Sequence, residues 1–117
     1  MVCEMREIAK LLKALSNDTR LSIMVLLNQK ELCVCQIENL LNISQVKVSR
    51  HLTVLKHAGL VTDRRAGLWI YYSAVKTKNK IEEKVFELFR EIESNKSSLK
   101  ISSIKLKSCK IIIKKGE

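Results

Sequence analysis

Two cysteines one residue apart, Cys33 and Cys35 in the stretch ELCVCQI, are the residues of this sequence best suited to chemistry. Thiolates bind soft metal ions, and the thiolate is also the reactive form of cysteine. A C-x-C pair cannot close an unstrained disulfide, and it is not the C-x-x-C of a redox helix. On the residues alone, a pair of core cysteines and a metal-binding pair both remain open.

The position of the pair adds a geometric constraint. A short helix is expected from about residue 34 to residue 41, which places both thiols near a helix N-terminus, where the helix dipole favours the thiolate. Residues i and i+2 of an α-helix lie about 200° apart around its axis. We therefore expect an ion that binds both sulfurs to distort the first turn of this helix.

Composition narrows the class of protein. The chain has 117 residues, 46% of them hydrophobic, with no Pro and only three Gly, which indicates one globular domain of helices with short connections. No apolar run approaches the length of a membrane span, and the N-terminus has no signal-peptide pattern, so a cytoplasmic protein is expected. Four cysteines in such a protein are better explained as thiols than as a disulfide framework.

The basic charge is distributed unevenly along the chain. The formal net charge is +10, and residues 96–117 hold seven Lys and one Glu. A basic excess favours a polyanionic partner such as nucleic acid. We expect a folded domain over residues 1–95 and a Lys-rich tail over residues 96–117, which is a basic arm, an extra strand or a disordered segment.

The order of elements predicts a mainly α fold with a small β-hairpin. Apolar periodicity, capping residues and β-branched runs predict helices over residues 4–15, 19–28, 34–41, 45–58 and 79–92, and strands over residues 60–62 and 69–72. Asn42, Ile43 and Ser44 form a short break between the third and fourth helices, with Ser44 as the N-cap, and Gly59 ends the fourth helix. Residues 63–68 are expected to join the two strands, with Gly67 as the turn residue.

Helix, short turn, helix and hairpin is the order of a winged helix-turn-helix, whose second helix lies in the DNA major groove. Its polar side chains suit this task, because Gln reads adenine, Arg reads guanine, and Lys and Ser hold phosphates. A merely solvated polar face is the alternative. The predicted DNA-binding residues are Ser44, Gln45, Lys47, Ser49, Arg50 and His51 on this helix, and Arg64 and Arg65 on the hairpin.

Four stretches resemble the ArsR/SmtB family of metal-responsive repressors, and ELCVC resembles its arsenic-sensing members as well as cadmium- and lead-sensing ones. They are LLKALSNDTRLSIMVLL, ELCVCQI, SQVKVSRHLTVLKHAGLV and RRAGLWIYY. The resemblance implies a homodimer joined through its first and last helices, bound to a palindromic operator of metal-resistance genes. It implies that DNA binding needs no cofactor and that As(III) or Sb(III) is the inducer, with Cd(II) or Pb(II) as the alternative.

Two thiolates leave such a site incomplete, since pyramidal As(III) takes three sulfurs. Glu38 stands where some arsenic-sensing relatives have a third cysteine. Cadmium- and lead-sensing relatives bring an N-terminal cysteine from the partner subunit, which makes Cys3 the candidate third ligand beside Cys33 and Cys35. Cys109, in the tail, is a weaker candidate. Residues 79–95 contain no His, which argues against the zinc site that other relatives build on the last helix.

Three other functions are alternatives to metal sensing. A thiol-redox repressor of the same fold uses the same cysteines, and an architectural DNA-binding protein would act through the Lys-rich tail. An enzyme is not expected, because the sequence has no C-x-x-C, no Gly-rich phosphate loop and no spaced Ser/His/Asp set.

Overall fold

The computed structural model describes residues 2–96 and residue 99, without the side chains of residues 2–4. Most of the predicted tail, including Cys109, lies outside the described residues. The described elements are α1 (Val2–Leu15), α2 (Asp18–Leu27), β1 (Leu32–Cys33), α3 (Val34–Leu41), α4 (Gln45–His57), β2 (Val61–Ala66), β3 (Trp69–Ala74) and α5 (Lys80–Asn95). This order confirms the predicted winged helix-turn-helix architecture and adds one short strand, β1.

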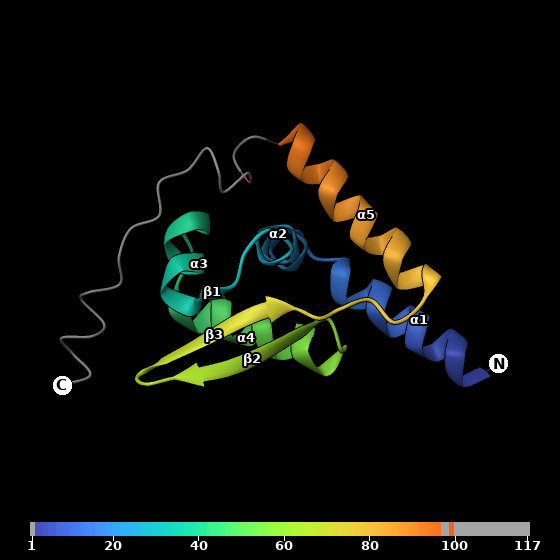
Figure 1. Ribbon diagram of the computed structural model, residues 1–117, viewed down its shortest axis with the longest axis horizontal. Coiled ribbons are helices and arrows are strands. Elements are labelled where there is room, and N and C mark those ends of the chain that lie inside the picture. The colour runs from blue at the N-terminus through green and yellow to red at the C-terminus, as the bar shows by residue number, and fades with distance from the viewer. Residues whose placement is uncertain (1, 97–98, 100–117) are drawn as a thin grey trace.

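Helix α2 forms the centre of the core and is seen nearly end-on in Figure 1. Its five consecutive buried residues, Ile23 to Leu27, contact several neighbouring elements. Asn17 caps the helix by accepting a hydrogen bond from the backbone N–H of Arg20 at 3.0 Å. Burial around the helix, in place of one apolar stripe, is what a central helix requires.

The turn between α3 and α4 uses the residues that were expected to form it. Asn42 adopts a left-handed conformation with φ of 56° and ends α3. Ser44 caps α4, since its side chain accepts a hydrogen bond from the backbone N–H of Lys47 at 3.3 Å. Gly59, with φ of 78°, follows the end of α4, as expected for a left-handed stop.

The strands form one antiparallel sheet in the order β1-β3-β2. The expectation that residues 63–68 form the connection was wrong, because Asp63 to Ala66 pair with β3, and only Gly67 and Leu68 turn the chain. Pairing with an apolar partner strand stabilises this polar segment as a strand. Strand β1 was not predicted, since a two-residue strand has no alternating pattern and exists only through its pairing with β3.

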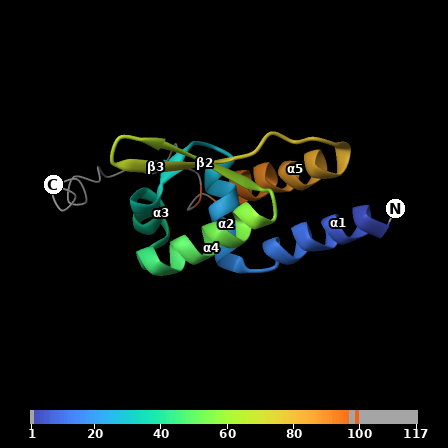
Figure 2. The same ribbon diagram turned by 90° about the horizontal axis from the view of Figure 1, so that it is seen from below.

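Helices α1 and α5 extend to one end of the molecule, whereas α3 and the turn of the hairpin lie at the other end (Figures 1 and 2). Asn79 caps α5 by accepting from the backbone N–H of Glu82, and Phe86 and Phe89 anchor the helix to the core. Each of the two helices also has large apolar side chains exposed to solvent. No helix within the described residues has the length and apolar character to cross a membrane.

Candidate nucleic-acid interface and thiol site

The second helix of the helix-turn-helix, α4, has one buried face and one polar face. Val48, Leu52 and Leu55 are buried against α2 and α3. The predicted DNA-binding residues Gln45, Lys47, Ser49 and Arg50 are all exposed. Within residues 2–96, neither of the two cations among them has an ion-pair partner. Amide, hydroxyl and cationic groups are therefore available on the first two turns of α4, where base edges and phosphates are contacted in this fold.

Val46 is an exposed residue of α4 that sequence reasoning missed. Its side chain is 60% exposed, at the start of the helix and away from the buried stripe. The sequence did indicate this exposure, because Val46 does not fall on the helical face that Val48, Leu52 and Leu55 share. An apolar side chain in this position can contact the methyl group of thymine.

His51 lies half-buried beside α2, away from the outer face of α4. Its Nδ1 is 3.4 Å from Nη1 of Arg20, whose Nε donates to the carbonyl oxygen of Ala14 at 2.6 Å. Partial burial, and then the positive charge of Arg20, lower the pKa of His51 below its ordinary value. The imidazole is therefore neutral at pH 7, and it joins α4 to α2. Arg20 had not been singled out from the sequence.

The two arginines of the hairpin point to opposite faces of the sheet. Arg64 is paired with Tyr71 and Arg65 with Ile70, and neighbouring positions of a strand alternate between faces. The face of Arg65 is the one toward α4, because Asp63 on the same face forms a 2.9 Å ion pair with Lys56 of α4. Arg65 is exposed and has no ion-pair partner among the described residues.

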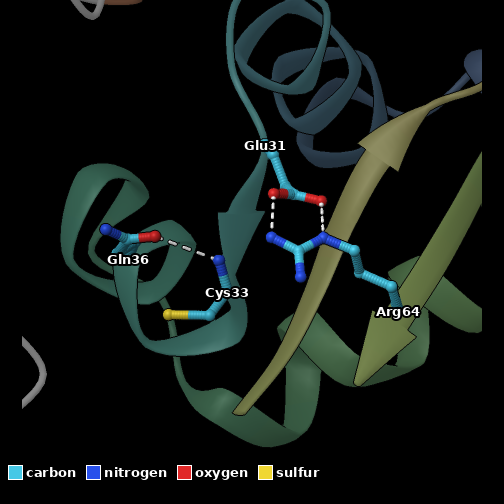
Figure 3. Close-up of polar contacts among 4 residues, drawn as sticks. All are labelled: Glu31, Cys33, Gln36 and Arg64. Atoms are coloured by element: carbon cyan, nitrogen blue, oxygen red, sulfur yellow. Dashed lines mark hydrogen bonds and ion pairs between the residues drawn. The ribbon is translucent and has the colours of Figure 1, made fainter. Parts of the chain in front are cut away.

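Arg64 is held by an acidic residue from the segment before β1. Its Nε and Nη2 donate to the two carboxylate oxygens of Glu31 at 2.7 and 2.8 Å (Figure 3). The guanidinium also lies 5.0 Å from the centre of the Tyr71 ring. The hydrogen bonds from Arg64 lower the pKa of the Glu31 carboxyl below its ordinary value, so the pair is ionised at pH 7.

The thiol pair lies where β1 ends and α3 begins. Cys33 pairs with Tyr71 of β3 and is also the N-cap of α3, with extended backbone angles of φ −90° and ψ 166°. Its N–H donates to Oε1 of Gln36 at 3.0 Å, as in a capping box (Figure 3). Cys35 is in the first turn of α3, with its sulfur 4.0 Å from Nδ2 of Asn39. The side chains of Cys33 and Cys35 are only 4% and 9% exposed.

This placement corrects the geometric expectation for the pair. The 200° separation applies when both residues are helical, whereas Cys33 lies outside the helix, in a strand. Pairing with β3 holds the backbone of Cys33 extended. The direction of its side chain is therefore not set by the helical geometry that applies to Cys35. The argument from helical rotation therefore does not apply to this pair, because only Cys35 is part of α3.

The described residues supply the sulfurs of Cys33 and Cys35 and no third metal ligand beside them. Cys35 takes part in a disulfide and Cys33 lies outside it, so the two sulfurs of the pair are not joined to each other, and the expectation that every cysteine is a thiol was wrong for Cys35. Metal binding by the pair requires the reduced protein. No group of three His, Cys, Asp or Glu side chains suited to a metal is found among the described residues, Glu38 included. Helix α1, which contains Cys3, begins at the end of the molecule away from β1 and α3 (Figure 1).

Comparison with known proteins places this arrangement in a family. The family described as "Bacterial regulatory protein, arsR family" matches residues 17–63, from the cap of α2 into β2. A Staphylococcus aureus homologue of the cadmium resistance regulatory protein CadC is 40% identical over 90 residues, which cover 75% of this chain and 74% of that one. The chain belongs to the ArsR family. The resemblance found in the sequence motifs is thereby confirmed.

Two further proteins are similar to this chain. The arsenical resistance operon repressor of Escherichia coli is 47% identical over 64 residues, 54% of this chain and 55% of that one. The solved structure of a homodimeric winged helix-turn-helix DNA-binding domain from Mycobacterium bovis has a TM-score of 0.66 and 32% identity, covering 80% of this chain and 81% of that one. This ArsR-family chain matches about half the length of the first arsenical relatives. The relatives named here are regulators and not enzymes, as was expected for this chain.

Proposed function

We propose that the protein is a cytoplasmic, homodimeric repressor of metal-resistance genes, which arsenite or antimonite releases from a palindromic operator. The observation that carries the proposal is the position of Cys33 and Cys35. Cys35 lies on α3, the helix that packs on the DNA-reading helix α4. Cys33 lies on β1, the strand that pairs with the hairpin. An ion bound there would contact β1 and α3, the elements that support the hairpin and α4, through one residue each. DNA binding itself requires no cofactor.

Exposed apolar side chains on α1 and α5 support the homodimer. Met5 and Leu12 of α1 are 66% and 54% exposed, and Ile81 and Leu88 of α5 are 45% and 50% exposed. In each pair the residues are two helical turns apart and therefore share a face. The similarity to a homodimeric M. bovis domain favours covering these faces with a second copy. Such a dimer has two-fold symmetry and presents two α4 helices to half-sites about one helical turn apart.

The metal site in this proposal consists of Cys33, Cys35 and a third thiolate. Soft thiolates select As(III), Sb(III), Cd(II) and Pb(II), and relatives named for arsenical and for cadmium resistance are both similar to this chain. We assign the third ligand to Cys3 of the second subunit, because α1 of the same chain begins far from β1 (Figure 1). Arsenite is the leading inducer, and Cd(II) or Pb(II) is the alternative.

The proposal is tested by selecting a preferred duplex from random DNA and titrating the reduced complex with metal ions. We expect a two-fold symmetric site. We also expect arsenite to lower the operator affinity about 5–150-fold, the usual range of allosteric coupling, as measured by fluorescence anisotropy. The release persists in excess reductant. Release that occurs only on oxidation, and is reversed by reductant, would instead establish the thiol-redox repressor.

On the DNA side, the proposal assigns thymine recognition to Val46. Replacing thymine by uracil removes one methyl group, whose burial contributes about 0.8 kcal/mol, or about fourfold in affinity. We expect uracil at one position of each half-site to weaken binding of the wild type by this factor. Binding of Val46→Ala should be the same with uracil as with thymine. Val54→Ala, which truncates another exposed valine of α4, is the control and keeps the uracil effect. Equal uracil effects in wild type and Val46→Ala would exclude the contact.

A further inference from the structure

The segment that leads into the thiol pair is joined to both strands of the hairpin. Leu32 and Cys33 pair through the backbone with Tyr72 and Tyr71 of β3. Glu31, the residue before this strand, binds Arg64 of the far strand, β2, whose side chain crosses β3 to reach the carboxylate (Figure 3). Residues 31–33 and the hairpin are therefore linked by two kinds of contact, a backbone ladder to β3 and an ion pair to β2.

The ion pair has a defined geometry although it lies at the surface. Two parallel hydrogen bonds of 2.7 and 2.8 Å hold the guanidinium in the plane of the carboxylate, and the Tyr71 ring lies 5.0 Å below it. The Arg64 and Glu31 side chains are 58% and 33% exposed. An exposed pair of this kind contributes little to the stability of a fold. Its main physical effect is to restrict how β1 and β2 move relative to one another.

Arg65, the residue after Arg64, differs from it in sheet face and in ion pairing, the two properties that matter for DNA binding. Arg65 is on the α4 face of the hairpin, without an ion-pair partner in the described part of the chain, whereas Arg64 is on the opposite face and engaged by Glu31. Two adjacent residues of one type thus have different surroundings. Arg65 is placed to contact the DNA backbone, and Arg64 is placed to contact the segment that contains Cys33.

We propose that Glu31 and Arg64 are positioning residues that transmit ion binding at Cys33 to the hairpin. The inference rests on the proposed function of the thiol pair. An ion shared with Cys35 displaces the Cys33 sulfur, and with it β1, relative to α3. Because Glu31 is two residues before Cys33 and holds Arg64, the displacement also shifts β2 and the adjacent Arg65. The hairpin thereby loses its fit to the DNA backbone together with α4.

The test compares operator affinity with and without arsenite in the reduced full-length wild type and in Glu31→Gln and Arg64→Gln. We expect both variants to bind the operator without arsenite within about threefold of the wild type, because this proposal assigns Arg64 to positioning in place of the DNA contact expected from the sequence: it is bound by Glu31 on the sheet face away from α4. We expect the arsenite-induced loss of affinity, about 5–150-fold in the wild type, to fall to about one-third of the wild-type factor or less. Calorimetric titration with arsenite should show unchanged stoichiometry, and urea unfolding an unchanged midpoint.

Arg65→Gln is the matched control, because it makes the same substitution one residue further on. It should weaken operator binding and reduce the salt dependence by about one counterion, while the arsenite factor stays that of the wild type. The double variant Glu31→Gln with Arg64→Gln should resemble either single variant, since one link is broken in each case. A wild-type arsenite factor in both single variants, or multiplying effects in the double variant, would overturn the inference. Failure of arsenite and the other thiophilic ions to release the wild type would instead overturn the proposed function.

Discussion

The Leu88→Glu variant is expected to be monomeric and to lose most of its affinity for a two-half-site operator. Leu88 is half-exposed in the single chain, on the apolar face that α5 shares with Ile81. In a two-fold symmetric dimer the substitution introduces two carboxylates into one interface. An unpaired buried charge costs about 3 kcal/mol or more, so two of them raise the dimer dissociation constant about 10⁴-fold. Operator affinity should fall about 10³-fold or more, because each monomer then binds a single half-site.

Sedimentation equilibrium and fluorescence anisotropy measure the two effects on the same preparations. Arg90→Glu is the control, since it places an acidic side chain two residues further along α5, on a polar and exposed part of the helix. This control should remain dimeric and bind the operator like the wild type. Circular dichroism checks that Leu88→Glu is folded. We expect a folded variant, because the core residues Phe86 and Phe89 are unaltered. A Leu88→Glu protein that remains a dimer would show that α5 does not form the interface.

Cys33→Ser and Cys35→Ser should each abolish arsenite-induced release while leaving operator binding intact. Serine preserves the shape of the side chain, but its hydroxyl is a poor ligand for a soft ion. The affinity factor of about 5–150 expected for the wild type should fall to about one in both variants. Both cysteines are buried, so a serine hydroxyl there lowers the unfolding free energy by about 1–3 kcal/mol.

Anisotropy titrations of the reduced variants with arsenite, antimonite, Cd(II), Pb(II) and Zn(II) provide the measurement, and urea unfolding confirms that each variant is folded. Cys3→Ser and Cys109→Ser rank the third ligand in the same titrations. We expect Cys3→Ser to weaken the response and Cys109→Ser to leave it unchanged. A response that survives both Cys33→Ser and Cys35→Ser would contradict metal sensing at this site.

The helices and the fold class followed from local patterns in the sequence. The spacing of Val48, Leu52 and Leu55 predicts the buried face of α4, and an isolated stripe of this kind has one stable orientation on a core. Ser44 and Gly59 mark the ends of that helix by chemistry that acts within three or four residues, and the structure confirms both. The family also followed from contiguous motifs, which comparison with known proteins confirmed. Every one of these features depends on residues close together in the chain.

The details of the thiol site and the hairpin were decided by contacts between distant residues. Cys33 is extended because β1 pairs with β3, whereas the i, i+2 argument from the sequence had treated both cysteines as helical. Arg64 and Arg65 looked equivalent in the sequence, but they lie on opposite faces of the sheet, and Glu31, 33 residues before Arg64, binds Arg64. His51, in turn, is drawn toward Arg20, 31 residues away. Periodicity reports which face of an element is buried, but strand pairing and ion pairs between separate elements form only when the chain has folded.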